Sequence, residues 1–110
     1  MQFMGSLYVG ESISTKEYEI VKKVHNKQVV PNLYLITMQN HPDSMLELIP
    51  EWEALQKGYP QEMLKVVGIA GGKKEAMNLV QDIILESIAE TGCVDVRGYL
   101  REKWEGQACR

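Results

Sequence analysis

The second half of the chain contains an apolar run, a pair of glycines and an amphipathic run in succession, and this order constrains the fold more than any other feature. Residues 63–70 are apolar on both faces of a strand, which is typical of a strand buried between two layers. Gly71 and Gly72 then form a turn. Apolar residues recur at helical spacing over residues 73–91, and Gly92 is a suitable C-terminal stop. The segment predicts strand, turn and helix, and places the chain in the mixed α and β class.

The elements before this segment are predicted from similar patterns. Residues 14–17 match a capping box with Ser14 as the N-cap, which predicts a helix over residues 15–27. Residues 32–38 are apolar on both faces and predict a second buried strand. Two further strands are expected at 6–10 and 45–49, and a short helix is expected at 51–57.

The end of the chain shows a different periodicity. Val94, Val96 and Leu100 alternate with polar residues, which predicts a half-buried strand over residues 94–101. We expect residues 1–104 to form a single domain, as the length of 110 residues indicates, and we expect the polar residues 105–110 to be a flexible tail.

The resulting order of elements is β-α-β-β-(short α)-β-α-β, which predicts an α+β fold. Removing one minor strand leaves β-α-β-β-α-β, the split unit of a ferredoxin-like two-layer α/β sandwich. A small doubly wound α/β sheet is the alternative.

Composition argues against several classes of protein. The chain has 12 Lys and Arg against 15 Asp and Glu, and 45% of its residues are hydrophobic, which excludes disorder. The basic residues are scattered, which argues against nucleic acid as a partner. No apolar run is long enough to span a bilayer, so no membrane is expected. Cys93 and Cys109 fit no redox or metal spacing and the N-terminus lacks a signal-peptide pattern, so we expect reduced thiols and a cytoplasmic location.

The glycine turn is the one position where the sequence indicates a ligand. Lys73 and Lys74 stand in the first turn of a helix, where the helix dipole favours acidic groups instead. The N–H groups of Gly71, Gly72 and Lys73 could hold the phosphate or carboxylate of a small anionic ligand. The known nucleotide-binding glycine patterns do not match, and the alternative is a simple turn with exposed lysines.

Other chemistry-bearing residues are dispersed along the chain. No spacing brings His25 or His41 together with a cysteine or carboxylate, so we expect neither a metal nor a cofactor. No nucleophile motif is complete, and we assign no catalytic residue. Arg97, Tyr99 and Arg101 would share one face of the last expected strand. There they could bind a planar anion, or simply protect the edge of a sheet.

Two strands that are apolar on both faces, with two long helices to cover them, indicate an incompletely covered sheet. In a ferredoxin-like layout both helices lie on the same face, and a large exposed apolar face is unusual on a monomer. A second copy of the chain would cover it, so we expect a homodimer. The residues expected at this interface are Tyr34, Ile36, Met38, Val67 and Ile69.

Three functions fit these features. The first is a homodimeric interaction or small-ligand-binding module without catalysis. The second is a small enzyme with a cleft at the dimer interface, using Arg97, Tyr99 and His41. The third is an anion- or phosphate-sensing regulatory module that uses residues 71–74.

Overall fold

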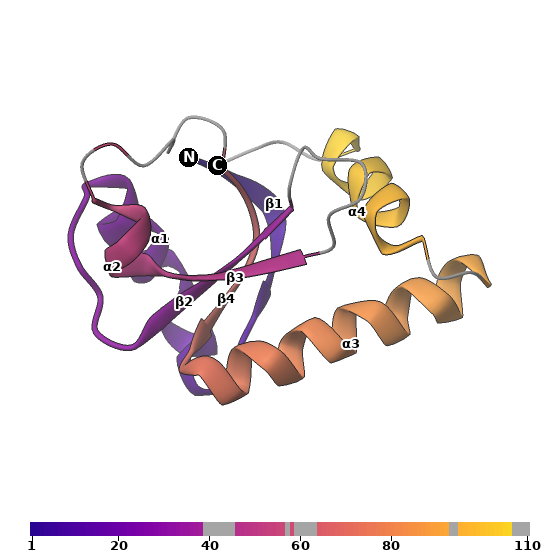
Figure 1. Cartoon of the computed structure of the whole chain (residues 1–110), viewed down its shortest axis with the longest axis horizontal. Coiled ribbons are helices and arrows are strands. Elements are labelled where there is room, and N and C mark those ends of the chain that lie inside the picture. The colour runs from indigo at the N-terminus through magenta and orange to yellow at the C-terminus, as the bar shows by residue number, and fades with distance from the viewer. Residues whose placement is uncertain (39–45, 57, 59–63, 93–94, 107–110) are drawn as a thin grey trace.

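The computed structural model describes residues 1–38, 46–56, 58, 64–92 and 95–106 of the chain (Figure 1). In this described part, the strands form one sheet in the order β1-β4-β2-β3. β1 runs parallel to β4, while β2 runs antiparallel to both β4 and β3, so the sheet is mixed. The strands are β1 (Gln2–Val9), β2 (Leu33–Met38), β3 (Leu46–Pro50) and β4 (Lys65–Gly71).

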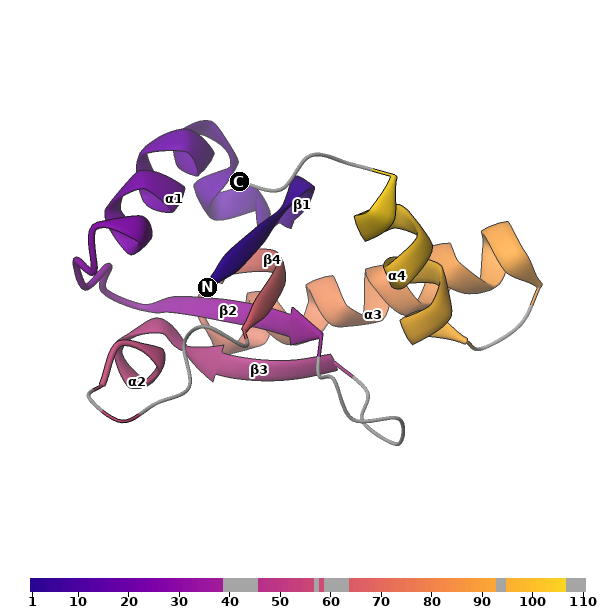
Figure 2. The ribbon, with the colours of Figure 1, turned by 90° about the horizontal axis from the view of Figure 1, so that it is seen from above.

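Helices lie on both faces of this sheet and give the molecule three layers (Figure 1, Figure 2). α1 and α2 cover one face, and α3 and α4 cover the other. A 3-10 helix, η1, connects β1 to α1. The bounds are η1 (Glu11–Lys16), α1 (Glu17–His25), α2 (Glu51–Ala54), α3 (Lys73–Thr91) and α4 (Val96–Glu105).

β4 supplies apolar side chains to both cores. Its pairing with β2 shifts by one residue at Val67, which is a local bulge. As a result Val66 and Ile69 pack against α1, whereas Val67 packs against α3 and α4. All three are fully buried, and burial of each contributes about 1.5–3 kcal/mol relative to exposure. The burial of this strand on both faces agrees with its two-sided apolar pattern, but helices of the same chain supply both covers.

The strand predicted at 94–101 is wrong, because residues 96–105 form α4. Val96, Leu100 and Trp104 are buried on one side of this helix. Residues four apart satisfy both a strand period of two and a helical turn, so their spacing did not distinguish the two structures. Asp95 decides the local start, since its side chain caps the helix by accepting a hydrogen bond from the Gly98 N–H at 3.0 Å.

The mixed α and β class is confirmed, but the ferredoxin-like arrangement is not. The final element is a helix instead of a strand, and the strand order is β1-β4-β2-β3. The covering of both faces by helices agrees better with the doubly wound alternative, although that fold has a mostly parallel sheet.

The apolar face expected to pair two copies is buried inside one chain. Ile36, Val67 and Ile69 have no exposed surface, Met38 is 6% exposed, and Tyr34 is half-buried. The prediction that these residues form a free surface is therefore wrong, because helices cover both faces of the sheet. The homodimer itself stays a prediction, but the exposed apolar face from which it was inferred is covered by helices of the same chain.

The capping box predicted at Ser14 is also not formed. The Ser14 hydroxyl donates to the Glu11 carbonyl at 3.1 Å inside η1, and α1 starts at Glu17 without a side-chain cap. Ser12, within the 3-10 helix that precedes α1, is bonded to Glu75 of α3.

None of the helices in the described ranges combines the length and the apolar character that a bilayer crossing requires. His41, Cys93 and Cys109 lie outside the described residues.

Candidate functional site

The carboxyl ends of β1 and β4 lie side by side, and the chain leaves them toward opposite faces of the sheet. Val9 pairs with Ile69, and the Gly10 N–H donates to the Ile69 carbonyl at 2.9 Å. From β1 the chain enters η1 and α1 on one face, and from β4 it enters α3 on the other (Figure 2). In open α/β sheets, such a divergence leaves a crevice at the strand ends, and ligands bind there.

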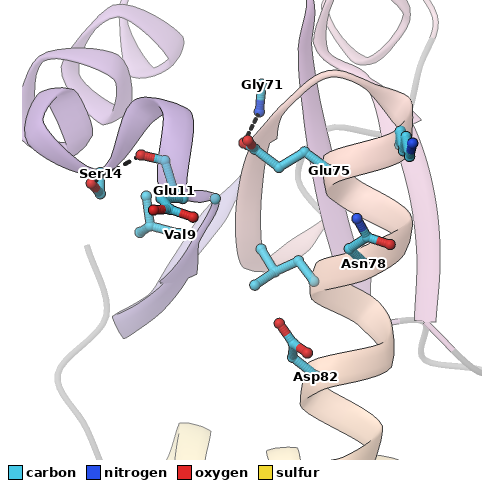
Figure 3. A pocket seen from close by; sticks show the side chains of 10 residues that line it. Val9, Glu11, Ser14, Gly71, Glu75, Asn78 and Asp82 are labelled. Atoms are coloured by element: carbon cyan, nitrogen blue, oxygen red, sulfur yellow. Dashed lines mark hydrogen bonds between the residues drawn. The ribbon is translucent and has the colours of Figure 1, made fainter.

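An open cleft of about 750 Å³ lies at this point (Figure 3). One wall comes from the end of β1 and from η1, and the other comes from the end of β4 and the first half of α3. Its lining combines carboxylate, amide and ammonium groups with the apolar side chains of Val9 and Leu79. The described lining residues are Val9, Gly10, Glu11, Ser14, Gly71, Lys74, Glu75, Asn78, Leu79 and Asp82.

Glu75 joins the two walls of the cleft. Its Oε1 accepts hydrogen bonds from the Gly71 N–H at 2.7 Å and from the Ser12 hydroxyl at 2.9 Å. Its Oε2 accepts a hydrogen bond from the Ser12 N–H at 3.2 Å. Burial acts to raise the pKa of Glu75, but these hydrogen bonds outweigh it and lower the pKa. We call this set of contacts the Glu75 bridge, and its carboxylate is ionised at neutral pH.

Two glycines leave the space that the Glu75 bridge occupies. A Cβ atom on Gly10 would lie 2.0 Å from Glu75 Oε1, and one on Gly71 would lie 2.6 Å from the Ser12 hydroxyl. Gly72 has φ +118° and ψ 155°, which side-chain-bearing residues rarely adopt. The glycines are therefore explained by close approach and by backbone conformation.

The anion site predicted at residues 71–74 contains a carboxylate of the chain itself. Gly71 and Lys74 line the cleft, but the Gly71 N–H already donates to Glu75. With Gly72 as N-cap, Glu75 is the third helical residue, the position from which a glutamate reaches back in a capping box. This spacing was the sequence signal that could have indicated the internal carboxylate. The negative charge of Glu75 in the same turn also explains how the helix start tolerates Lys73. Binding of an external anion stays a prediction.

The second predicted ligand set does not share one face. Arg97 and Arg101 are one turn apart on α4, whereas Tyr99 lies roughly 200° around the helix from either of them. The Tyr99 hydroxyl donates to Glu86 Oε2 at 3.0 Å. The arrangement expected for stacking on a planar anion depended on a strand and is not formed.

Tyr99 instead belongs to a polar cluster that connects β1, α3 and α4. The Tyr8 hydroxyl donates to the same Glu86 carboxylate, and the Lys103 ammonium donates to Tyr8 at 2.8 Å. Lys103 also lies 3.6 Å from Glu86 Oε2 and 4.5 Å from the centre of the Tyr8 ring. Burial raises the pKa of Tyr8, and Glu86 raises it further, so this phenol stays protonated. The cluster fixes α4, and no local sequence pattern could indicate partners 78 and 95 residues apart.

Comparisons of the chain with protein-family models, with curated proteins and with solved structures found no match. The function is therefore inferred from the geometry of the cleft.

Proposed function

We propose that the chain is a small-ligand-binding module without catalysis, and that its ligand occupies the cleft at the carboxyl ends of β1 and β4. The observation that carries this proposal is the divergence of the chain after these two parallel neighbours. A crevice between helices on opposite faces is a property of the backbone, and side chains need only leave it open.

The walls of the cleft support binding because they are fixed before a ligand arrives. The Glu75 bridge ties η1 to α3, and the Gly10 N–H ties the start of η1 to β4. Preorganised walls reduce the entropy that binding must overcome.

The polar groups in the cleft favour binding over catalysis. Among the described lining residues there is no histidine or cysteine. The Ser14 hydroxyl donates to a backbone carbonyl instead of to a general base. Nucleophilic catalysis by a serine needs such a base within hydrogen-bond reach.

The test is a fragment screen by two-dimensional NMR on the ¹⁵N-labelled full chain. Fragments that bind should shift the amide signals of Gly10, Gly71 and Asn78 in a saturable way. Asn78→Trp places an indole in the cleft and should weaken binding by at least about tenfold, which corresponds to 1.4 kcal/mol. The matched control is Gln81→Trp, because Gln81 is exposed on α3 and is not among the residues that line the cleft.

Two results would contradict the proposal. In one, no fragment shifts the cleft signals while other surfaces respond. In the other, the Trp variants at positions 78 and 81 weaken binding equally, which would place the ligand elsewhere.

A further inference from the structure

We infer that the ligand of this cleft carries a positively charged amine or guanidinium group. The inference rests on the proposed function, since the cleft defines the site and its charges select among ligands. The described lining contains three carboxylates, those of Glu11, Glu75 and Asp82, against the single ammonium of Lys74.

The three carboxylates do not have the same role. Glu75 is saturated by donors from Gly71 and Ser12. Within the described ranges, no hydrogen bond or ion pair engages the carboxylate of Glu11 or of Asp82. These two groups are available to a ligand.

The available carboxylates stand on different walls. Glu11 projects from η1, and Asp82 projects from α3 toward the open space (Figure 3). Val9 and Leu79 add apolar surface, and the Asn78 amide lies one turn before Asp82 on α3. A short aliphatic body with a cationic end, or one at each end, matches this distribution of groups.

An anion would meet the opposite conditions. The Gly71 N–H that would bind it already donates to Glu75, whose carboxylate occupies the position. Over the whole cleft, three carboxylates stand against one ammonium, and an excess of one sign of charge concentrates ions of the opposite sign. The charge balance therefore favours a cation over the phosphate or carboxylate suggested by the glycine turn.

The experiment compares three probes with the same four-carbon spacer: 1,4-diaminobutane, butane-1,4-diol and succinate. Each is titrated into the labelled chain at constant ionic strength. Only the diamine should shift the cleft amides saturably, and its affinity should fall as sodium chloride is added, since exposed charges are screened over ~8 Å near physiological salt.

Charge-neutral variants separate binding in the cleft from general attraction to an acidic protein. Asp82→Asn and Glu11→Gln should each weaken diamine binding by roughly two- to fivefold, the range for an exposed ion pair. Glu53→Gln removes the same charge from an exposed position on α2 and should leave the affinity unchanged. Because both cleft carboxylates are exposed, neither variant should affect folding, and the amide spectrum checks this.

The outcomes distinguish the two proposals. If succinate or the diol shifts the cleft amides and the diamine does not, the cationic ligand is wrong and the binding cleft stands. Equal weakening by Glu53→Gln and Asp82→Asn would likewise overturn the cationic ligand. If none of the three probes and no fragment of the screen shifts the amide signals of the cleft, both proposals are wrong.

Discussion

Glu75 and Glu51 each follow one of two strands that run in the same direction, β4 and β3. The pKa values of their carboxyl groups are shifted in opposite directions. Glu75 lies in the first turn of α3 and accepts three hydrogen bonds, from the Gly71 N–H and from both donors of Ser12. Glu51 starts α2 and is fully buried. Its Oε1 accepts one hydrogen bond, from the Val30 N–H at 2.5 Å, and in the described part of the chain its Oε2 has no partner.

The number of donors decides the direction in which the pKa of each glutamate is shifted. For Glu75, hydrogen bonds outweigh the effect of burial, and the pKa is lowered. For Glu51, burial raises the pKa and the single bond from Val30 lowers it only in part. Donors that converge on a carboxylate stabilise its charge, whereas one donor does not offset the loss of water. The first environment favours the ionised form of the carboxyl group, and the second disfavours it.

These opposite shifts give opposite contributions to stability against pH. A lowered folded pKa stabilises the protein above the unfolded value of 4.5, and this stabilisation is lost as pH falls through the folded pKa. A raised folded pKa favours the fold at low pH, and that advantage is lost as pH rises from 4.5 through the folded pKa. The two glutamates can therefore be separated by measuring stability at several pH values.

The largest loss of stability is expected from a substitution in the glycine turn that precedes Glu75. Gly72→Ala forces an L-residue into a conformation with φ +118°, and should lower the free energy of unfolding by about 1–3 kcal/mol. Urea denaturation followed by circular dichroism measures this. Gly106→Ala is the control, because Gly106 has φ −83° and an added Cβ would meet only ordinary contacts. Equal losses of stability in both variants would show that the positive φ at Gly72 does not account for the effect.

An intermediate effect is expected from neutralising Glu75 itself. Glu75→Gln keeps an acceptor but removes the charge, and should cost about 1 kcal/mol at pH 7, within the range for helix-start caps. The difference from wild type should shrink as pH falls below 4.5, because the wild-type carboxyl also becomes neutral. Thermal midpoints from pH 3 to pH 8 test this, with Glu53→Gln as the exposed control. A loss that does not change with pH would contradict the assigned charge.

The smallest effect, of opposite sign, is expected at Glu51. Glu51→Gln keeps the acceptor for the Val30 N–H and removes the charge that burial disfavours. Relative to wild type, its stability should increase as pH rises from 4 to 8, because the wild-type carboxyl loses its low-pH advantage, while the buried donor of the new amide lowers stability equally at every pH. The same thermal series measures it. A difference from wild type that does not change between pH 4 and pH 8 would contradict the raised pKa of Glu51.

Much of the second half of the molecule could be predicted from local pattern. The helix expected over 73–91 has these bounds in α3, and Gly92 ends it with φ +74° and an N–H bonded to the Ile88 carbonyl at 2.8 Å. The strand expected at 63–70 contains most of β4. Both depend on periodicity and on glycine conformation, which act over a few residues and are visible in the sequence.

The candidate site could be predicted only in part. Gly71 and Lys74 were found because a glycine turn before a helix is a local signal. Glu11 and Asp82 were missed, since they line the same cleft only because η1 and α3 leave the sheet on opposite faces. The partner of Glu75 was missed for the same reason, as Ser12 lies 63 residues away.

The sequence by itself determined which segments bury apolar surface, where α3 begins and ends, and that the protein mixes helices with strands. The tertiary structure alone decided that helices cover both faces of the sheet, that residues 96–105 are helical, and that the glycine turn receives an internal carboxylate. The physical reason is the distance along the chain over which each kind of interaction acts. Backbone conformation and side-chain period are set by neighbours in the chain, whereas burial of a face and the donors around a carboxylate are set by segments that meet only after folding.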